Sequence, residues 1–201
     1  LFSHQMFVNW KKNKTNVLDT HGVDDFVGEV IDNLKVADTA LIMVNAAAGV
    51  EVGTELVWEN VEDYKTPSIF VINQMAHQKA DYDAALEQLT NRFGSKVIPI
   101  QYQLNSGESF NQIVDALRMV MYEFPATGGK PEKKPIPESE MARANEMHNA
   151  LVEMAAENEE GLMEKYFEEG NLSEEELAQG LMIGLAKHDF FPVFVASGAK
   201  D

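Results

Sequence analysis

Three short, almost wholly apolar runs alternate with amphipathic segments in the first half of the chain. The runs are residues 39–45 (TALIMVN), 68–73 (SIFVIN) and 96–101 (KVIPIQ). Between them, residues 51–64 and 80–93 have the apolar spacing of helices. A short uninterrupted apolar run is typical of a strand buried on both faces of a parallel sheet. Strands that alternate with helices form right-handed βαβ units, so we predict an α/β fold built on a parallel sheet.

The two ends of the chain extend this pattern. Residues 6–10 and 15–18 are strand-like runs joined by the basic turn 11–14, which predicts a hairpin. Residues 24–36 follow with apolar residues at helical spacing. Residues 191–196 (FPVFVA) return to the composition of a buried strand. We therefore expect the sheet to be interrupted by a long insertion and then completed.

The insertion differs in character from the sheet that it interrupts. Three of its segments have helical patterns: residues 139–158, 159–168 and 173–187. Residues 110–124 fit either a helix or a pair of short strands. The glycines and prolines of residues 125–137 indicate a loop. We predict a mainly helical insertion.

Composition and charge exclude several classes of protein. The chain has no cysteine, and therefore no disulfide or thiolate site. No apolar run is long enough to cross a bilayer and no signal peptide is present, which predicts a cytoplasmic protein without a membrane partner. The net charge is −17, and the residues after 100 carry 19 acids against 8 bases. We expect no broad or sequence-specific contact with nucleic acid there; the acidic surface is either solvated or a dock for a basic partner.

A short motif, Asp19-Thr20-His21-Gly22, follows the predicted hairpin. Glycine lets the backbone approach a bound group, and its N–H can donate to a phosphate oxygen. The carboxylate of Asp19 can hold a Mg²⁺ ion through water. The motif is therefore a candidate phosphate grip.

Three motifs in a fixed order carry a family resemblance. After Asp19 to Gly22 come Asn73-Gln74-Met75-Ala76, behind a later strand, and Ser197-Gly198, behind the last. The G domain of a GTPase has its DxxG, NKxD and SA motifs at these places. Together with the stretches VDDFVGEV, NAAAGVEVGTELVW, VIPIQ and LMEKYFEEGNLSEEEL, they make nearly the whole chain resemble bacterial elongation factor G, the ribosomal translocase.

The resemblance implies an architecture. It predicts an α/β, P-loop-NTPase-like parallel sheet with an inserted, mainly helical α+β subdomain. Residues 1–100 would be a partial G domain, residues 101–190 a G′-like insertion, and residues 191–201 the last strand with the base-contacting loop. Because the chain begins without methionine and stops directly after a strand, we expect a fragment of a larger protein.

The resemblance also implies a site and partners. Its nucleotide-binding residues would be Asp19, Gly22, Asn73, Gln74, Ser197 and Gly198. Asp19 would hold Mg²⁺ through water, Gly22 would meet the γ-phosphate of GTP, and Ser197 with Gly198 would meet the guanine carbonyl. The implied cofactors are GTP or GDP and Mg²⁺. The implied partners are the ribosome and, through the acidic G′ region, the ribosomal stalk protein.

Two departures from the family pattern weaken this chemistry. The family reads DTPGH, and its histidine orients the attacking water; Val23 stands there and can neither position nor deprotonate water. His21 is expected to be a turn residue and no substitute. The aspartate of NKxD, which accepts two hydrogen bonds from guanine, is replaced by Ala76, and Gln74 replaces the lysine that covers the base. We predict no catalytic residue, weak or absent GTP hydrolysis, and poorer discrimination against adenine.

No phosphate loop of the G-x-x-x-x-G-K-[ST] type occurs in the sequence. Gly128-Gly129-Lys130-Pro131 is not one, because proline removes an N–H and forbids the helical turn. We expect the loop upstream if the chain is a fragment, and lost if it is complete. Two alternatives stay open: a non-catalytic ribosome-binding pseudo-GTPase module, and a ribosome-protection factor of the tetracycline-resistance type.

Overall fold

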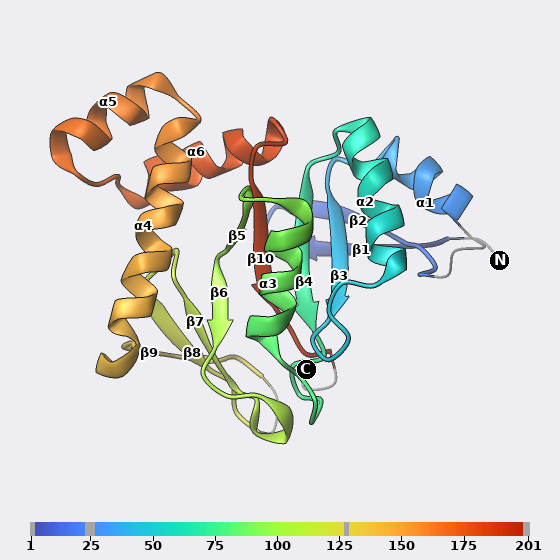
Figure 1. Ribbon diagram of the computed structural model, residues 1–201, viewed down its shortest axis with the longest axis horizontal. Helices are drawn as coiled ribbons and strands as arrows, with labels where there is room; N and C mark the ends of the chain where they lie inside the picture. Colours follow the sequence, from blue (N-terminus) through green and yellow to red (C-terminus); the bar gives the residue numbers. More distant parts are fainter. Residues whose placement is uncertain (1–2, 23–26, 127–128, 199–201) are drawn as a thin grey trace.

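The computed structural model describes residues 3–22, 27–126 and 129–198, whose strands form three separate sheets (Figure 1). The central sheet has four parallel strands in the order β3-β4-β10-β5. They are β3 Ala40–Asn45, β4 Ser68–Asn73, β10 Phe191–Val195 and β5 Val97–Pro99. The predicted parallel α/β sheet is confirmed, and the last strand of the sequence lies between two earlier ones.

Two crossover helices, α2 Val52–Tyr64 and α3 Tyr82–Phe93, cover one face of this sheet (Figure 1). Their aromatic side chains meet over the middle strand. The Trp58 ring centroid lies 5.3 Å from that of Phe70 and 4.8 Å from that of Phe93. Such ring pairs stabilise the fold by about 0.5–1.5 kcal/mol each beyond simple burial. This cluster is the centre of the first hydrophobic core.

The other face of the sheet is only partly covered. Near β5 and β10 it packs against the C-terminal helices, where Ile98 and Phe194 join a second hydrophobic core. On β3, Leu41 is 63% and Met43 is 53% exposed. The prediction that residues 39–45 are buried on both faces is therefore wrong. The strand lies at the sheet edge, and no described helix reaches its second face.

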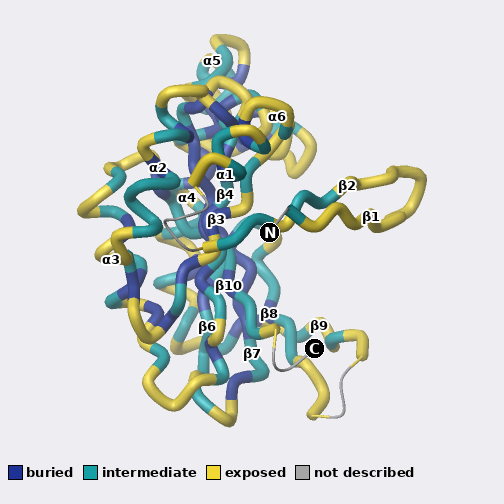
Figure 2. Tube along the Cα trace, turned by 90° about the vertical axis from the view of Figure 1, so that its right-hand side faces the viewer, coloured by how far each residue is buried: buried dark blue, intermediate teal, exposed yellow. Residues whose placement is uncertain are grey.

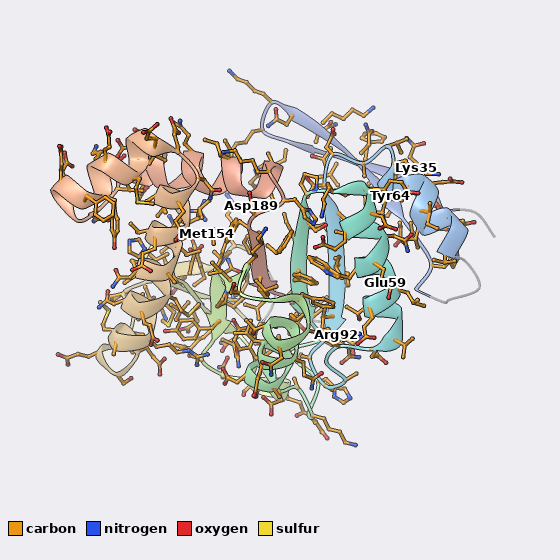
Figure 3. All side chains as sticks on the ribbon, turned by 45° about the horizontal axis from the view of Figure 1, so that its top comes forward. Lys35, Glu59, Tyr64, Arg92, Met154 and Asp189 are labelled. Carbon is orange, nitrogen blue, oxygen red and sulfur yellow. The ribbon has the colours of Figure 1, made fainter. Side chains whose placement is uncertain are left out.

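The predicted N-terminal hairpin is confirmed as a sheet of its own. Strands β1 His4–Trp10 and β2 Asn13–Asp19 pair antiparallel through a two-residue turn, and the hairpin projects from the body of the molecule (Figure 2). Of the helix predicted over residues 24–36, the structure describes α1 Val27–Leu34, and residues 35–36 form a turn instead. Lys35, just after α1, places its ammonium group 5.7 Å from the Tyr64 ring centroid of α2 (Figure 3).

The third sheet is antiparallel, and it decides whether residues 110–124 form a helix or strands. Its strands are β6 Gln101–Gln103, β7 Gln112–Asp115, β8 Val120–Glu123 and β9 Glu132–Lys134. Residues 110–124 thus form strands rather than a helix. The predicted loop over residues 125–137 is corrected in part, because three of its residues pair as β9 with β8. Short 3₁₀ turns occupy Gly107–Ser109 and Glu138–Glu140.

Three helices complete the chain before β10: α4 Met141–Glu157, α5 Glu160–Glu169 and α6 Glu174–Ala186. The predicted capping box is present, since the Ser173 hydroxyl accepts from the Glu176 N–H and the Glu176 carboxylate accepts from the Ser173 N–H. None of the described helices is long and apolar enough to cross a membrane. The β6–β9 sheet and these helices fall within residues 101–190, whose boundaries as a domain stay a prediction.

Candidate nucleotide site

The candidate site lies where the parallel strands end. Because the carboxyl ends of β3, β4 and β10 meet at one edge of the sheet, the loops that follow them come together. The Ala46 N–H donates to the Asn73 carbonyl at 2.9 Å, and the Met75 N–H donates to the Ala196 carbonyl at 3.3 Å. The side chain of Met75 is completely buried and anchors the loop after β4 in the core.

Two predicted base-binding motifs are in direct contact. The Gly198 N–H donates to the Asn73 side-chain oxygen at 3.2 Å, and the Ala76 N–H donates to the Ser197 hydroxyl at 3.3 Å. These pairs join residues more than a hundred positions apart in the sequence. The structure therefore brings together Asn73, Ser197 and Gly198 as one double loop.

Gln74 adopts a left-handed backbone conformation, with φ of 64°. Its exposed side chain accepts a hydrogen bond from the Asn45 amide at 3.2 Å. A non-glycine residue at positive φ is held there only by its surroundings, and this contact is part of them. Asn45 is a site residue that the sequence reasoning missed. Its position as the last residue of a parallel strand was the available signal.

Among the described residues of this loop, no carboxylate takes the place of the missing base-reading aspartate. Ala76 is half-buried and packs against the first core. The nearby Asp81 side chain caps α3 by accepting from the Ala84 N–H at 3.0 Å. The ring of His77 accepts from the Lys79 N–H at 3.2 Å. The loop thus keeps Asn73 but has no carboxylate at the predicted base-reading position, and base binding by this loop stays a prediction.

Asp19 and Gly22 lie apart from this double loop. Asp19 ends β2 and is exposed, and its strand partner is His4. Gly22 follows and is also exposed. Within the described ranges, no hydrogen bond or ion pair connects either residue to Asn73 or Ser197, and no group of three His, Asp or Glu side chains could hold a metal ion. In the described part of the chain, the predicted phosphate-binding residues Asp19 and Gly22 are therefore not joined to the predicted base-binding loops.

Near position 23, where the family motif has its histidine, the structure describes His21 and Gly22. His21 is half-buried, and its ring nitrogen lies 3.5 Å from the Glu29 carboxylate of α1. This contact directs the ring toward the helix; that His21 does not replace the family histidine stays a prediction. Val23 lies outside the described residues.

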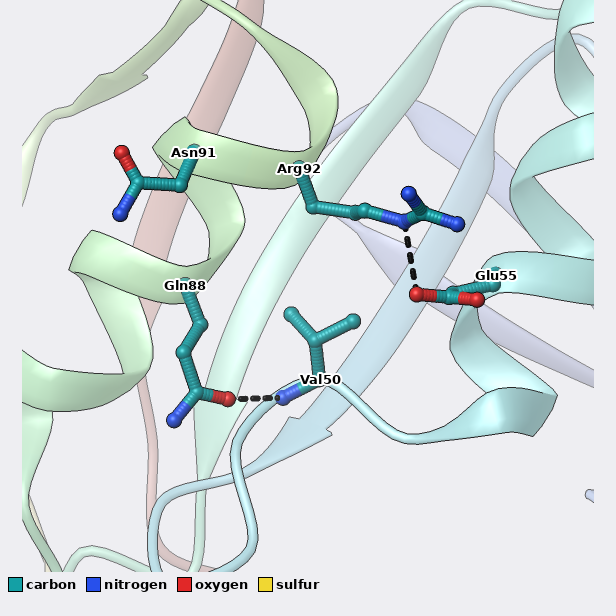
Figure 4. Close-up of a pocket in the computed structure, with 5 residues that line it drawn as sticks. All are labelled: Val50, Glu55, Gln88, Asn91 and Arg92. Carbon is teal, nitrogen blue, oxygen red and sulfur yellow. Dashed lines mark hydrogen bonds and ion pairs between the residues drawn. The ribbon is translucent and has the colours of Figure 1, made fainter.

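A surface hollow of about 320 Å³ lies beside the site, between the loop after β3 and helix α3 (Figure 4). Four of its five lining residues form two pairs: the Val50 N–H donates to the Gln88 side-chain oxygen at 2.9 Å, and Arg92 pairs with Glu55 at 2.6 Å. Gly49, at φ of 73°, leaves room for the Gln88 amide, which a Cβ atom would meet. We assign the hollow a structural role in bracing the loop.

Comparison with known proteins defines the class. Residues 2–201 match the family of elongation factor Tu GTP binding domains, and the chain belongs to that family. More specifically, it is similar to an elongation factor G-like protein of Thermotoga maritima, with 32% identity over 198 residues. That alignment covers 98% of this chain and 28% of the relative. The crystal structure of a Thermus thermophilus protein matches 99% of this chain and 30% of its own, at a TM-score of 0.89 and 30% identity.

These likenesses place the chain among the translational GTPases of the elongation factor G family. The chain spans less than a third of the length of either relative.

Proposed function

We propose that the chain is part of an elongation factor G-like GTP-binding protein that acts on the ribosome in the cytoplasm and promotes translocation. The observation that carries this proposal is the double loop in which the Asn73 oxygen accepts from the Gly198 N–H. In the proposed complex, Asn73 and Gln74 line the base, and Ser197 and Gly198 meet the guanine carbonyl. Asp19 holds Mg²⁺ through water, and the Gly22 N–H meets the γ-phosphate.

The phosphates need a further element. No glycine-rich phosphate loop occurs among the 201 residues, so affinity for GTP depends on one supplied by another segment. Within the described residues, β3 has no strand partner on its outer edge, and Leu41 and Met43 are exposed beside it. That edge offers a place where a strand bearing such a loop would pair. In the absence of such a strand, we expect nucleotide affinity to be weak.

GTP hydrolysis is proposed to be weak or absent, because Val23 has no group that can orient water. The test is turnover of labelled GTP by the full-length protein with ribosomes. We expect turnover far below that of an ordinary translocase measured alongside. A comparable rate would refute this part of the proposal.

A second candidate is a non-catalytic ribosome-binding module, and the surface of α5 and α6 favours it. Acidic side chains crowd these helices, and among them Phe167 and Met182 are largely exposed. An acidic surface with apolar anchors fits a partner that presents basic and apolar side chains. The family resemblance implies the ribosomal stalk protein as the partner of this region. Ribosome binding that persists without any nucleotide would favour the module over the GTP-dependent factor.

A further inference from the structure

Asn45 is the last residue of β3 and lies beside the predicted base-binding loop. In the parallel register of β3 with β4 its partner is Asn73, and the Ala46 N–H donates to the Asn73 carbonyl. The two strands therefore end together, and Asn45 is next to the turn that begins at Gln74. A side chain on a strand is held more precisely than one on a loop. Asn45 can thus serve as a fixed support for that turn.

The orientation of the Asn45 amide is set by the backbone. The Ala47 N–H donates to the Asn45 side-chain oxygen at 2.8 Å. Because a backbone N–H can only donate, this contact assigns the oxygen of the amide and leaves its NH₂ group on the other branch. That NH₂ group donates to the Gln74 side-chain oxygen at 3.2 Å. One backbone group therefore fixes the Asn45 amide, and the Asn45 amide fixes that of Gln74.

The same contact determines which end of the Gln74 side chain can meet a ligand. Since the Gln74 oxygen accepts from Asn45, the NH₂ group of Gln74 points away from Asn45. The backbone of Gln74 is left-handed, with φ of 64°, a conformation that a residue other than glycine keeps only when its surroundings hold it. The backbone and side chain of Gln74 are thus arranged before any ligand binds, and such preorganisation increases affinity.

We propose that Asn45 is a positioning residue of the nucleotide site and that it acts through Gln74. Asn45 does not touch the nucleotide in this arrangement. It holds Gln74 so that the N–H donors of the Gln74 amide face an oxygen or nitrogen acceptor of the nucleotide. The inference deepens the proposed function and rests on it, because the orientation of Gln74 matters only if this loop binds a nucleotide.

The test is calorimetry of the full-length protein with GDP and Mg²⁺, comparing the wild type with Asn45→Ser, Gln74→Ala and the double variant. Serine keeps an oxygen for the Ala47 N–H, because it forms the same kind of local turn, but its shorter side chain does not reach Gln74. Asn45→Ser is expected to weaken GDP binding about fivefold, the equivalent of one hydrogen bond. In the Gln74→Ala background the same substitution should have no further effect, because no amide is left to position.

The matched control is Asn91→Ser, the same change at an amide of α3 that lines the neighbouring hollow. It should leave the affinity for GDP unchanged, and both serine variants should keep the urea midpoint of the wild type. A lowered midpoint in Asn45→Ser alone would overturn the inference in favour of a structural role. Wild-type affinity in Asn45→Ser, or an equal loss with and without Gln74, would also overturn it. Absence of GDP binding by the wild-type protein would instead overturn the proposed function, and this inference with it.

Discussion

At Asn73, one side-chain oxygen holds together two loops that are 125 residues apart in the sequence. This oxygen accepts from the Gly198 N–H, while the Ala76 N–H donates to Ser197. Neither hydrogen bond uses the side chain of Ala76, which stands where the family motif would have its guanine-reading aspartate.

We predict that Asn73→Ala lowers the free energy of unfolding by about 1 kcal/mol, because the Gly198 N–H loses its partner. Gln74→Ala is the control: its side chain is exposed and loses only the Asn45 contact, so the change should stay within about 0.5 kcal/mol. Urea denaturation measures both. Equal effects of the two substitutions would contradict the role assigned to Asn73.

The sequence predicts part of this residue-level picture. Asn73, Ser197 and Gly198 could be placed together because each lies at or just beyond the end of a parallel strand, and such strand ends share an edge. The contact between Asn45 and Gln74 could not, because it depends on the left-handed conformation of Gln74, which no local pattern indicates. Asp19 and Gly22 could be identified as a motif, but not located relative to the double loop.

Helices α4 and α6 pack closely against each other at Gly180. A Cβ atom there would lie 2.5 Å from the Ala155 carbonyl oxygen, which is backbone and cannot move aside cheaply. We predict that Gly180→Ala destabilises the protein by about 1–3 kcal/mol. In α5, Gly161 has open space around it, and Gly161→Ala should instead stabilise by up to about 1 kcal/mol. Thermal or urea unfolding of both variants tests this, and a neutral Gly180→Ala would exclude the tight crossing.

The cap of α6 has a pH dependence with a definite sign. Hydrogen bonds lower the pKa of Glu176 from 4.5 to about 2; the largest contribution comes from Lys165 and the next from Ser173. Its stabilising contribution is therefore complete above pH 4.5 and is lost as the pH falls toward 2. The stability deficit of Glu176→Gln should shrink over that window in denaturation curves, whereas Glu175→Gln serves as the control for charge alone. A deficit independent of pH would refute this.

For β3, the sequence pattern predicts the strand itself but not how far each of its faces is buried. Its apolar run predicts a strand, which is correct, but the cover on its second face depends on neighbours that the run does not specify. Likewise, residues 110–124 have spacing that suits a helix, yet pairing with β6 and β9 makes them strands. The local pattern of these residues suits a helix and a pair of strands equally, and pairing with distant strands makes them strands.

The two faces of β3 should differ in their response to truncation. Ile42 is 5% exposed and Leu41 is 63% exposed. Ile42→Ala should cost about 2–5 kcal/mol, whereas Leu41→Ala should change the free energy of unfolding by no more than about 0.5 kcal/mol. Both are measured by urea denaturation of the same preparation. A large loss at Leu41 would show that its face is covered.

The described residues form the framework of the family to which the chain belongs. The parallel sheet, the β6–β9 sheet and the three C-terminal helices agree with the elongation factor G family, as does the structural match over 99% of the chain. The outer edge of β3, the projecting basic hairpin and the acidic helices are surfaces on which further chain or partners can be placed. We propose above all that the base loop of a GTP-binding domain is built here without its reader of guanine.

Calorimetry of the full-length protein with GTP and ATP, side by side, tests this claim most directly. Wild-type protein should show little preference for GTP, and Ala76→Asp should gain at least about fivefold, because a restored carboxylate satisfies a guanine edge whose loss costs about 1–3 kcal/mol. A strong wild-type preference for GTP that Ala76→Asp leaves unchanged would contradict the account.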